Sequence, residues 1–142
     1  MILDSYNQFS DAQALTATAA STNSIDLGVD NVGIGEPLAV LISLDVAADD
    51  ADADETYSVA LETDDNDSFS SATVIGSRTI PAGSAAGSKF VISVPADSSA
   101  ERYVRLNYTL GGTTPSVTVT AFLQPQNMLD NYEKYPNAYT IS

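Results

Sequence analysis

A two-residue alternation of apolar and polar side chains recurs along this chain, and it is the feature that most constrains the fold. In the segment PLAVLISLDV, from Pro37 to Val46, the apolar residues that share one face are Leu38, Val40, Ile42, Leu44 and Val46. Successive side chains of a β-strand point to opposite sides, so this pattern predicts a strand with one buried face. No segment shows a sustained 3.6-residue period, so we expect no long amphipathic helix.

Five further segments carry the same alternation, and turn-forming sequences rich in Gly, Pro, Asp and Ser separate them. Their expected inward residues are Tyr57, Val59 and Leu61; Val74 and Ile80; Phe90, Ile92 and Val94; Val104, Leu106, Tyr108 and Leu110; and Val117, Val119, Ala121 and Leu123. Six or more short strands at this spacing predict an all-β fold, an antiparallel β-sandwich or barrel. The length of 142 residues suits a single domain over residues 1–142.

The opening segment, MILDSYNQFSDAQALTATAASTNSIDLG, continues the pattern. Residues 13–20 and 25–27 alternate on either side of a turn, which predicts two short strands. A capping box from Ser10 to Gln13 favours instead a helix that begins at Asp11, although the Ser and Thr residues that follow are poor helix formers.

The first residues lack the basic and long apolar stretches of a targeting peptide, so we expect an ordered N-terminal segment over about residues 1–12. Its apolar side chains either complete the core or form an arm that contacts a neighbouring subunit. These side chains are Ile2, Leu3, Tyr6 and Phe9.

The C-terminal segment, about residues 124–142, breaks the strand pattern, because Pro125 and Pro136 oppose regular pairing. It contains Tyr132, Tyr135 and Tyr139. Disordered tails are poor in aromatic residues, so we expect this segment to be ordered and packed. Its tyrosines either pack on their own domain or form a subunit interface.

The charge and composition exclude several classes of function. Nineteen acidic residues against five basic ones give a net charge of −14, so nucleic acid and anionic membranes are not expected as partners. No apolar run is long enough to span a bilayer. The chain has no Cys and no His, and it lacks the G-x-S-x-G and phosphate-loop motifs. We therefore expect a protein that is not an enzyme and binds no cofactor; a carboxylate pair of the glycosidase type is the enzymatic alternative.

Ten of the nineteen acidic residues lie within residues 45–67, where there is no Lys or Arg. Part of this segment copies the spacing of the first three ligands of an EF-hand loop, at Asp50, Asp52 and Asp54. The loop would need Gly at the position of Glu55 and Glu at the position of Leu61, so an EF-hand is excluded.

A second group of acids, Asp64, Asp65 and Asp67, is a candidate calcium site, because carboxylate oxygens are the ligands that calcium prefers. The alternative is that both acidic stretches are solvated loops, whose charge discourages pairing between sheet edges.

Four segments together resemble the Bbp16-family capsid cement proteins of tailed bacteriophages: the opening 28 residues, GIGEPLAV, VALETDDNDSFSSAT and RYVRLNYTLGG. The resemblance runs in the same order over nearly the whole chain. It implies a jelly-roll-like β-sandwich that binds the outer surface of the shell of the major capsid protein and stabilises it, typically as a homodimer. It also implies a place on the outer capsid surface of the virion, after synthesis in the cytoplasm of the host bacterium.

Contacts with the shell are expected from the chain ends and from the few arginines. Arg78, Arg102 and Arg105 could meet an acidic shell surface or could balance local carboxylates. The candidate interface residues are Ile2, Leu3, Tyr6, Phe9, Arg102, Arg105, Tyr132, Tyr135 and Tyr139. The alternative function is a calcium-assisted carbohydrate- or receptor-binding module, in which the tyrosines would stack on a sugar; the lack of Trp argues against it.

Overall fold

A computed structural model describes residues 5–28, 37–94 and 100–129. Its elements are η1 (Ser5–Asn7), β1 (Gln8–Leu15), β2 (Ala19–Ala20), β3 (Ile25–Asp26), β4 (Leu38–Val46), β5 (Thr56–Asp64), β6 (Thr73–Ile80), β7 (Lys89–Val94), β8 (Tyr103–Gly111), β9 (Val117–Pro125) and η2 (Gln126–Met128). Within these residues, no helix is long and apolar enough to cross a membrane.

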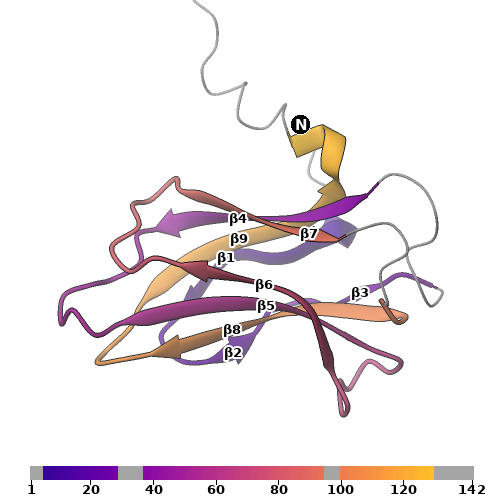
Figure 1. Ribbon diagram of the computed structural model, residues 1–142, viewed down its shortest axis with the longest axis horizontal. Helices are drawn as coiled ribbons and strands as arrows, with labels where there is room; N and C mark the ends of the chain where they lie inside the picture. Colours follow the sequence, from indigo (N-terminus) through magenta and orange to yellow (C-terminus); the bar gives the residue numbers. More distant parts are fainter. Residues whose placement is uncertain (1–4, 29–36, 95–99, 130–142) are drawn as a thin grey trace, which may run out of the picture.

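The strands form two antiparallel sheets that lie one above the other (Figure 1). The four-stranded sheet has the order β1-β9-β4-β7, and the five-stranded sheet has the order β2-β8-β5-β6, with β3 also paired to β8. If β2 and β3 are counted as one interrupted strand, eight strands form two four-membered sheets, which is the jelly-roll arrangement. The expected antiparallel β-sandwich is confirmed.

The core fills the space between the sheets with the side chains that the alternation predicts to point inward. Val40, Ile42 and Leu44 of β4 are at most 1% exposed. The inward residues of β5, β8 and β9 belong to the same apolar cluster, with Leu110 and Phe90 partly buried at its margin. Burial of this aliphatic and aromatic surface provides the main stabilisation of the fold.

Two valines that the alternation assigns to the core lie instead in solvent. Val46 is 56% exposed, and the pairing of β4 with β9 shifts register just before it, which leaves Asp45 out of the ladder. Val74 is 55% exposed, and a shift in the pairing of β5 with β6 leaves Ile75 unpaired beside it. A β-bulge adds one residue to one strand and so reverses the alternation on one side of it.

The opening segment is extended, as expected, but its strands differ from the predicted ones. β1 ends at Leu15, and the chain then crosses to the other sheet, where β2 begins at Ala19. The alternative helix at Asp11 is wrong, because Ser10 and Gln13 do not cap a helix but bond to each other, Oγ to Oε1, at 2.7 Å.

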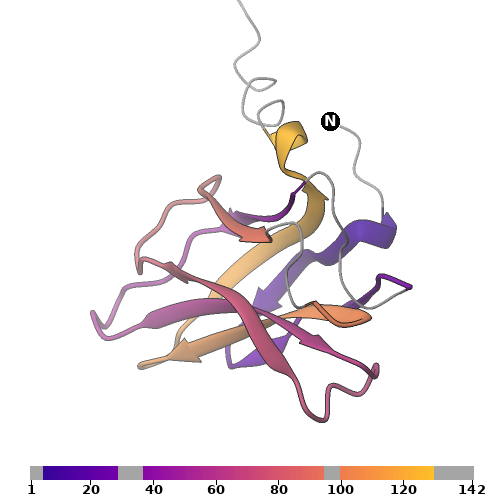
Figure 2. The same ribbon diagram turned by 45° about the vertical axis from the view of Figure 1, so that its right-hand side comes forward.

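The two acidic stretches lie at opposite ends of β5 (Figures 1 and 2). Residues 47–55 connect β4 to β5, and residues 65–72 connect β5 to β6. Because the nine residues of β5 span about 30 Å, the two stretches are separate features of the surface.

Candidate functional site

The N-terminal interface candidates are divided between surface and core. Tyr6, in η1, is 86% exposed. Phe9 is fully buried in the core, so its ring is not available for contact with another subunit. Ile2 and Leu3 lie outside the described residues. Tyr6 is therefore the member of this group that the structure places on the surface.

Arg102 pairs with Asp26 at one end of the five-stranded sheet. Its Nε and Nη2 each donate a hydrogen bond of 2.9 Å to the Asp26 carboxylate, and its guanidinium lies 5.1 Å from the centre of the Tyr103 ring. The hydrogen bonds from Arg102 and from the Gly28 amide lower the pKa of Asp26 from 3.8 to about 2. This arginine therefore balances a carboxylate of its own chain.

Arg105 makes a more enclosed contact on the neighbouring part of the same sheet. Its Nε donates to Glu62 Oε2 at 2.9 Å, and its guanidinium stacks 4.4 Å from the centre of the Phe69 ring. Glu62 and Phe69 are both buried. Arg105 thus holds the β5–β6 connection against the sheet through a cation–π contact and an ion pair.

Arg78 lies on edge strand β6, with its guanidinium 5.8 Å from the centre of the Phe90 ring of β7. It bridges the two sheets at the side where their edge strands meet. The three tyrosines of the C-terminal segment, Tyr132, Tyr135 and Tyr139, lie outside the described residues.

The acidic β4–β5 connection is held by hydrogen bonds to its own carboxylates. Glu55 is 5% exposed, and its two oxygens accept from the amides of Asp52 and Asp54. The Asp54 carboxylate in turn accepts from the amide and hydroxyl of Thr113, at 2.8 and 3.0 Å. These acids therefore shape the loop and attach it to the β8–β9 turn.

The β5–β6 connection is built around Asp64, which is fully buried. Its carboxylate accepts hydrogen bonds from the Ser71 amide at 2.8 Å and from the side-chain amide of Asn66 at 2.9 Å. Burial alone would raise the pKa of Asp64, but these and further hydrogen bonds outweigh it and lower that pKa below 3.8. The charged form of Asp64 therefore organises this loop.

A group of three carboxylates occurs at the same place. Asp64, Asp65 and Glu101 each offer one oxygen, and these oxygens lie within 4.8 Å of one another. Such a group could hold a hard cation such as calcium. Of the three predicted calcium ligands, Asp64 and Asp65 belong to it, whereas Asp67 does not.

Glu101 was not predicted for this group, because it stands 37 positions after Asp64 in the chain. A hydrogen bond of 2.7 Å from the Glu101 amide to the Thr63 hydroxyl positions it beside β5. No local sequence pattern marks this contact, which depends on the pairing of β5 with β8.

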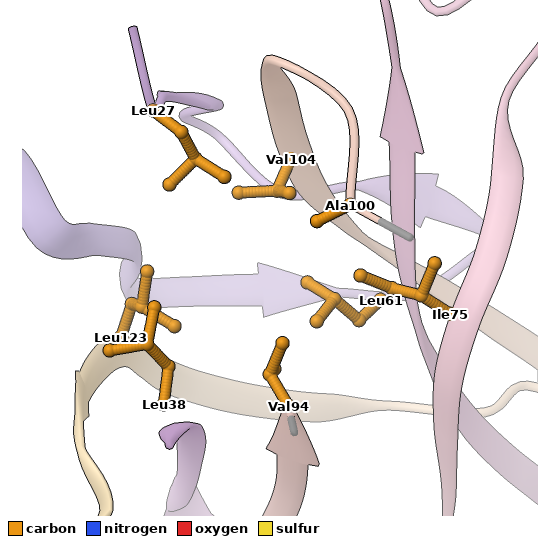
Figure 3. Close-up of a pocket in the computed structure, with 8 residues that line it drawn as sticks. All are labelled: Leu27, Leu38, Leu61, Ile75, Val94, Ala100, Val104 and Leu123. Atoms are coloured by element: carbon orange, nitrogen blue, oxygen red, sulfur yellow. The ribbon is translucent and has the colours of Figure 1, made fainter. Parts of the chain in front are cut away.

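An apolar pocket opens between the sheets at one end of the sandwich (Figure 3). The space inside it that a water-sized sphere can reach is only about 10 Å³, room for about one water molecule, so the pocket is too small for a ligand. It is lined by Leu27, Leu38, Leu61, Ile75, Val94, Ala100, Val104 and Leu123. Since these side chains are all aliphatic, the pocket offers none of the convergent polar groups that orient a ligand.

The described residues therefore define an antiparallel jelly-roll sandwich whose polar side chains mainly shape loops and pair with one another. The family model Bbp16 matches residues 9–123, from β1 through most of β9. The chain belongs to the Bbp16 family, which is a phage-related family.

No curated protein matches the chain. One solved structure that resembles it is the Clostridium thermocellum endo-1,4-β-D-xylanase 10B, in its CBM22-1 and GH10 modules complexed with xylohexaose. The identity is 14% and the TM-score 0.40; the match covers 84% of this chain and 20% of the xylanase chain. Similarity at this level does not indicate a shared function.

Proposed function

We propose that this protein is a bacteriophage capsid cement protein that binds the outer surface of the major capsid protein shell and stabilises it. The observation that carries the proposal is the family match, which includes almost the whole sandwich. A cement protein needs contact area and a rigid scaffold rather than a catalytic site. The arginine pairs and the bonded acidic loops are in keeping with that need.

The net charge of −14 also supports the proposal. A protein of this charge is repelled by DNA, so it would not compete for the genome that the shell packages. We propose the outer shell surface as its location and a homodimer as its assembly state. Sedimentation equilibrium of the purified protein tests the dimer.

Co-sedimentation with purified shells of the major capsid protein of the same phage tests the function directly. We expect saturable binding, together with a higher temperature of shell rupture. Binding that leaves the rupture temperature unchanged would indicate passive decoration instead of cementing. Absence of binding would contradict the proposal.

The N-terminal arm is tested by a deletion that spares the core. Removal of Met1 to Phe9 would take away a fully buried ring, so loss of binding in that variant would not separate an arm from a folding defect. Removal of Met1 to Asn7 keeps Phe9 and all of β1. If the arm contacts the shell, this shorter variant folds normally and binds the shell more weakly.

The second candidate function is calcium-assisted binding of a glycan or receptor, and the carboxylate group of Asp64, Asp65 and Glu101 is the observation in its favour. If a cation is held there, millimolar calcium raises the melting temperature of the protein, and Glu101→Gln abolishes that increase. Glycan-array binding that requires calcium would then favour this function over cementing. A melting temperature that does not respond to calcium would contradict it.

A further inference from the structure

The outer face of the five-stranded sheet carries two rows of small, uncharged side chains. In one row, Thr109 lies opposite Ser58, which lies opposite Thr79. In the other row, Ala20, Asn107, Ala60 and Ser77 follow one another across four strands. Directly opposed side chains of neighbouring strands are about 5 Å apart, so the rows form one continuous surface. We call these seven residues the neutral face.

The neutral face is open, whereas the corresponding part of the other sheet is covered. Each of the seven residues is at least partly exposed. On the outer face of the four-stranded sheet, Leu41 and Phe122 are opposed across β4 and β9 and are at most 2% exposed, although they are not part of the core cluster. The five-stranded sheet therefore offers the more accessible sheet face of the described chain.

The neutral face carries no charge, although the chain as a whole is strongly acidic. The chain has a net charge of −14, yet none of the seven residues is ionisable. In the next row, Arg105 and Glu62 neutralise each other at 2.9 Å. The acidic connections lie beyond the two ends of β5 (Figure 2). A partner surface that meets this face buries no unpaired carboxylate, which is the costly step for an acidic protein.

The margin of the neutral face carries side chains that are common in protein interfaces. Val74 is 55% exposed next to the Arg105–Glu62 pair, and it is one of three large apolar residues with high exposure in the described chain. Tyr103 is half-buried one row further on, under the guanidinium of Arg102. Tyrosine and arginine are enriched among the residues that dominate binding energy.

We infer that the neutral face, with Val74 at its margin, is the surface that contacts the capsid shell, and that its partner is a flat, uncharged area of the major capsid protein. The inference rests on the proposed function. An uncharged interface has little ionic attraction to screen, so its affinity varies little with salt. Docking of the acidic loops on a basic patch would instead weaken steeply as salt increases.

Two matched substitutions separate these arrangements in the co-sedimentation assay. Ala60→Arg places a long charged side chain in the middle of the neutral face, and we expect it to weaken shell binding by at least about tenfold. Ala51→Arg makes the same change at an exposed position of the acidic β4–β5 connection, and we expect unchanged binding. Circular dichroism and the melting temperature verify the fold, and Ser77→Arg on β6 replaces Ala60→Arg if that variant is unfolded. Sedimentation equilibrium verifies the assembly state: if the arginine variant loses the dimer together with shell binding, the neutral face is the dimer contact and the inference is overturned.

The outcomes distinguish a failure of the inference from a failure of the proposed function. If the wild-type protein binds shells and both arginine variants of the neutral face bind equally well, the inference is overturned while the proposed function stands. If Ala51→Arg alone weakens binding, or if salt weakens wild-type binding by more than about tenfold, the acidic connection is the contact and the inference is again overturned. If the wild type does not bind at all, both the proposed function and the inference fail.

Discussion

The phenolic hydroxyl of Tyr108 lies 2.8 Å from Oγ of Ser10, and this hydrogen bond joins β8 of one sheet to β1 of the other. Both residues are at most 1% exposed. Ser10 Oγ donates its proton to Gln13 Oε1, so Tyr108 is the donor to Ser10. The side-chain amide of Gln13 then donates to the carbonyl of Ala20 at 3.0 Å. The network ties both sheets together where the chain crosses between them.

Removal of either hydroxyl should destabilise the protein, but to different degrees. Tyr108→Phe loses one hydrogen bond, and we expect a loss of about 1 kcal/mol in the free energy of unfolding. Ser10→Ala leaves the buried Tyr108 hydroxyl without its acceptor, and we expect a loss of about 2 kcal/mol. Urea denaturation measures both values.

Tyr103→Phe is the control, since Tyr103 is only half-buried and lies on the same strand. We expect a change within about 0.5 kcal/mol. A Tyr103 effect as large as that of Tyr108, or a Ser10→Ala effect smaller than that of Tyr108→Phe, would contradict the role assigned to the network.

A titration at alkaline pH should show that the hydroxyl of Tyr108 is buried. Burial raises the pKa of Tyr108, and it also raises the pKa of Tyr57, above the ordinary value of 10.0. Because the folded state holds these protons more tightly, their contribution to stability is complete below pH 10 and is lost as pH rises through the folded pKa values. Absorbance at 295 nm should show that Tyr57 and Tyr108 ionise only above pH 10 or on unfolding.

In the Tyr108→Phe variant, the ionisation of Tyr108 above pH 10 should be missing, whereas that of Tyr57 should remain. If the folded protein shows no tyrosine that ionises above pH 10, neither Tyr57 nor Tyr108 is protected from solvent.

Gly112→Ala should strongly disturb the β8–β9 turn. Gly112 has a φ of 93°, and an added Cβ would lie 2.7 Å from Cα of Glu55 and still closer to the carbonyl oxygen of Asp54. Backbone atoms cannot move aside cheaply, so we expect a loss of about 2 to 4 kcal/mol in the free energy of unfolding. Thermal and urea denaturation measure it.

Gly87→Ala separates the steric effect from the conformational one. Gly87 has a φ of 88°, but an added Cβ there would meet nothing within 4 Å. We expect this substitution to cost only the left-handed backbone strain, about 1 to 2 kcal/mol. If Gly112→Ala and Gly87→Ala lower the free energy of unfolding equally, the β8–β9 turn does not lie as close to the β4–β5 connection as the structure places it.

Arg102→Gln should raise the pKa of Asp26. Arg102 is the first cause of the low pKa of about 2, so we expect that pKa to move back toward 3.8. In the wild type, the contribution of the pair to stability is present above pH 3.8 and is lost as pH falls through about 2. An NMR titration of the Asp26 carboxyl carbon measures the change; an unaltered pKa would mean that the pair does not persist in solution.

The alternation of apolar residues was sufficient to predict the strands from β4 to β9 and most of their inward faces. It failed at Val46 and Val74, because a bulge depends on how two strands pair and not on either strand alone. For the candidate site, the sequence located Asp64 and Asp65 but not Glu101, which reaches them only through β8. It left open whether Arg102 and Arg105 serve a partner or balance their own carboxylates.

The sequence by itself determined the all-β class, the single apolar face of each long strand and the excess of negative charge, since these are properties of local order and composition. Only the tertiary structure decided that Phe9 belongs to the core and that Arg105 stacks on Phe69. It also brought seven uncharged residues from four strands onto one open face. These contacts join residues that are far apart in the chain. They form because the strands pair, and that pairing depends on how all the strands together fill one core.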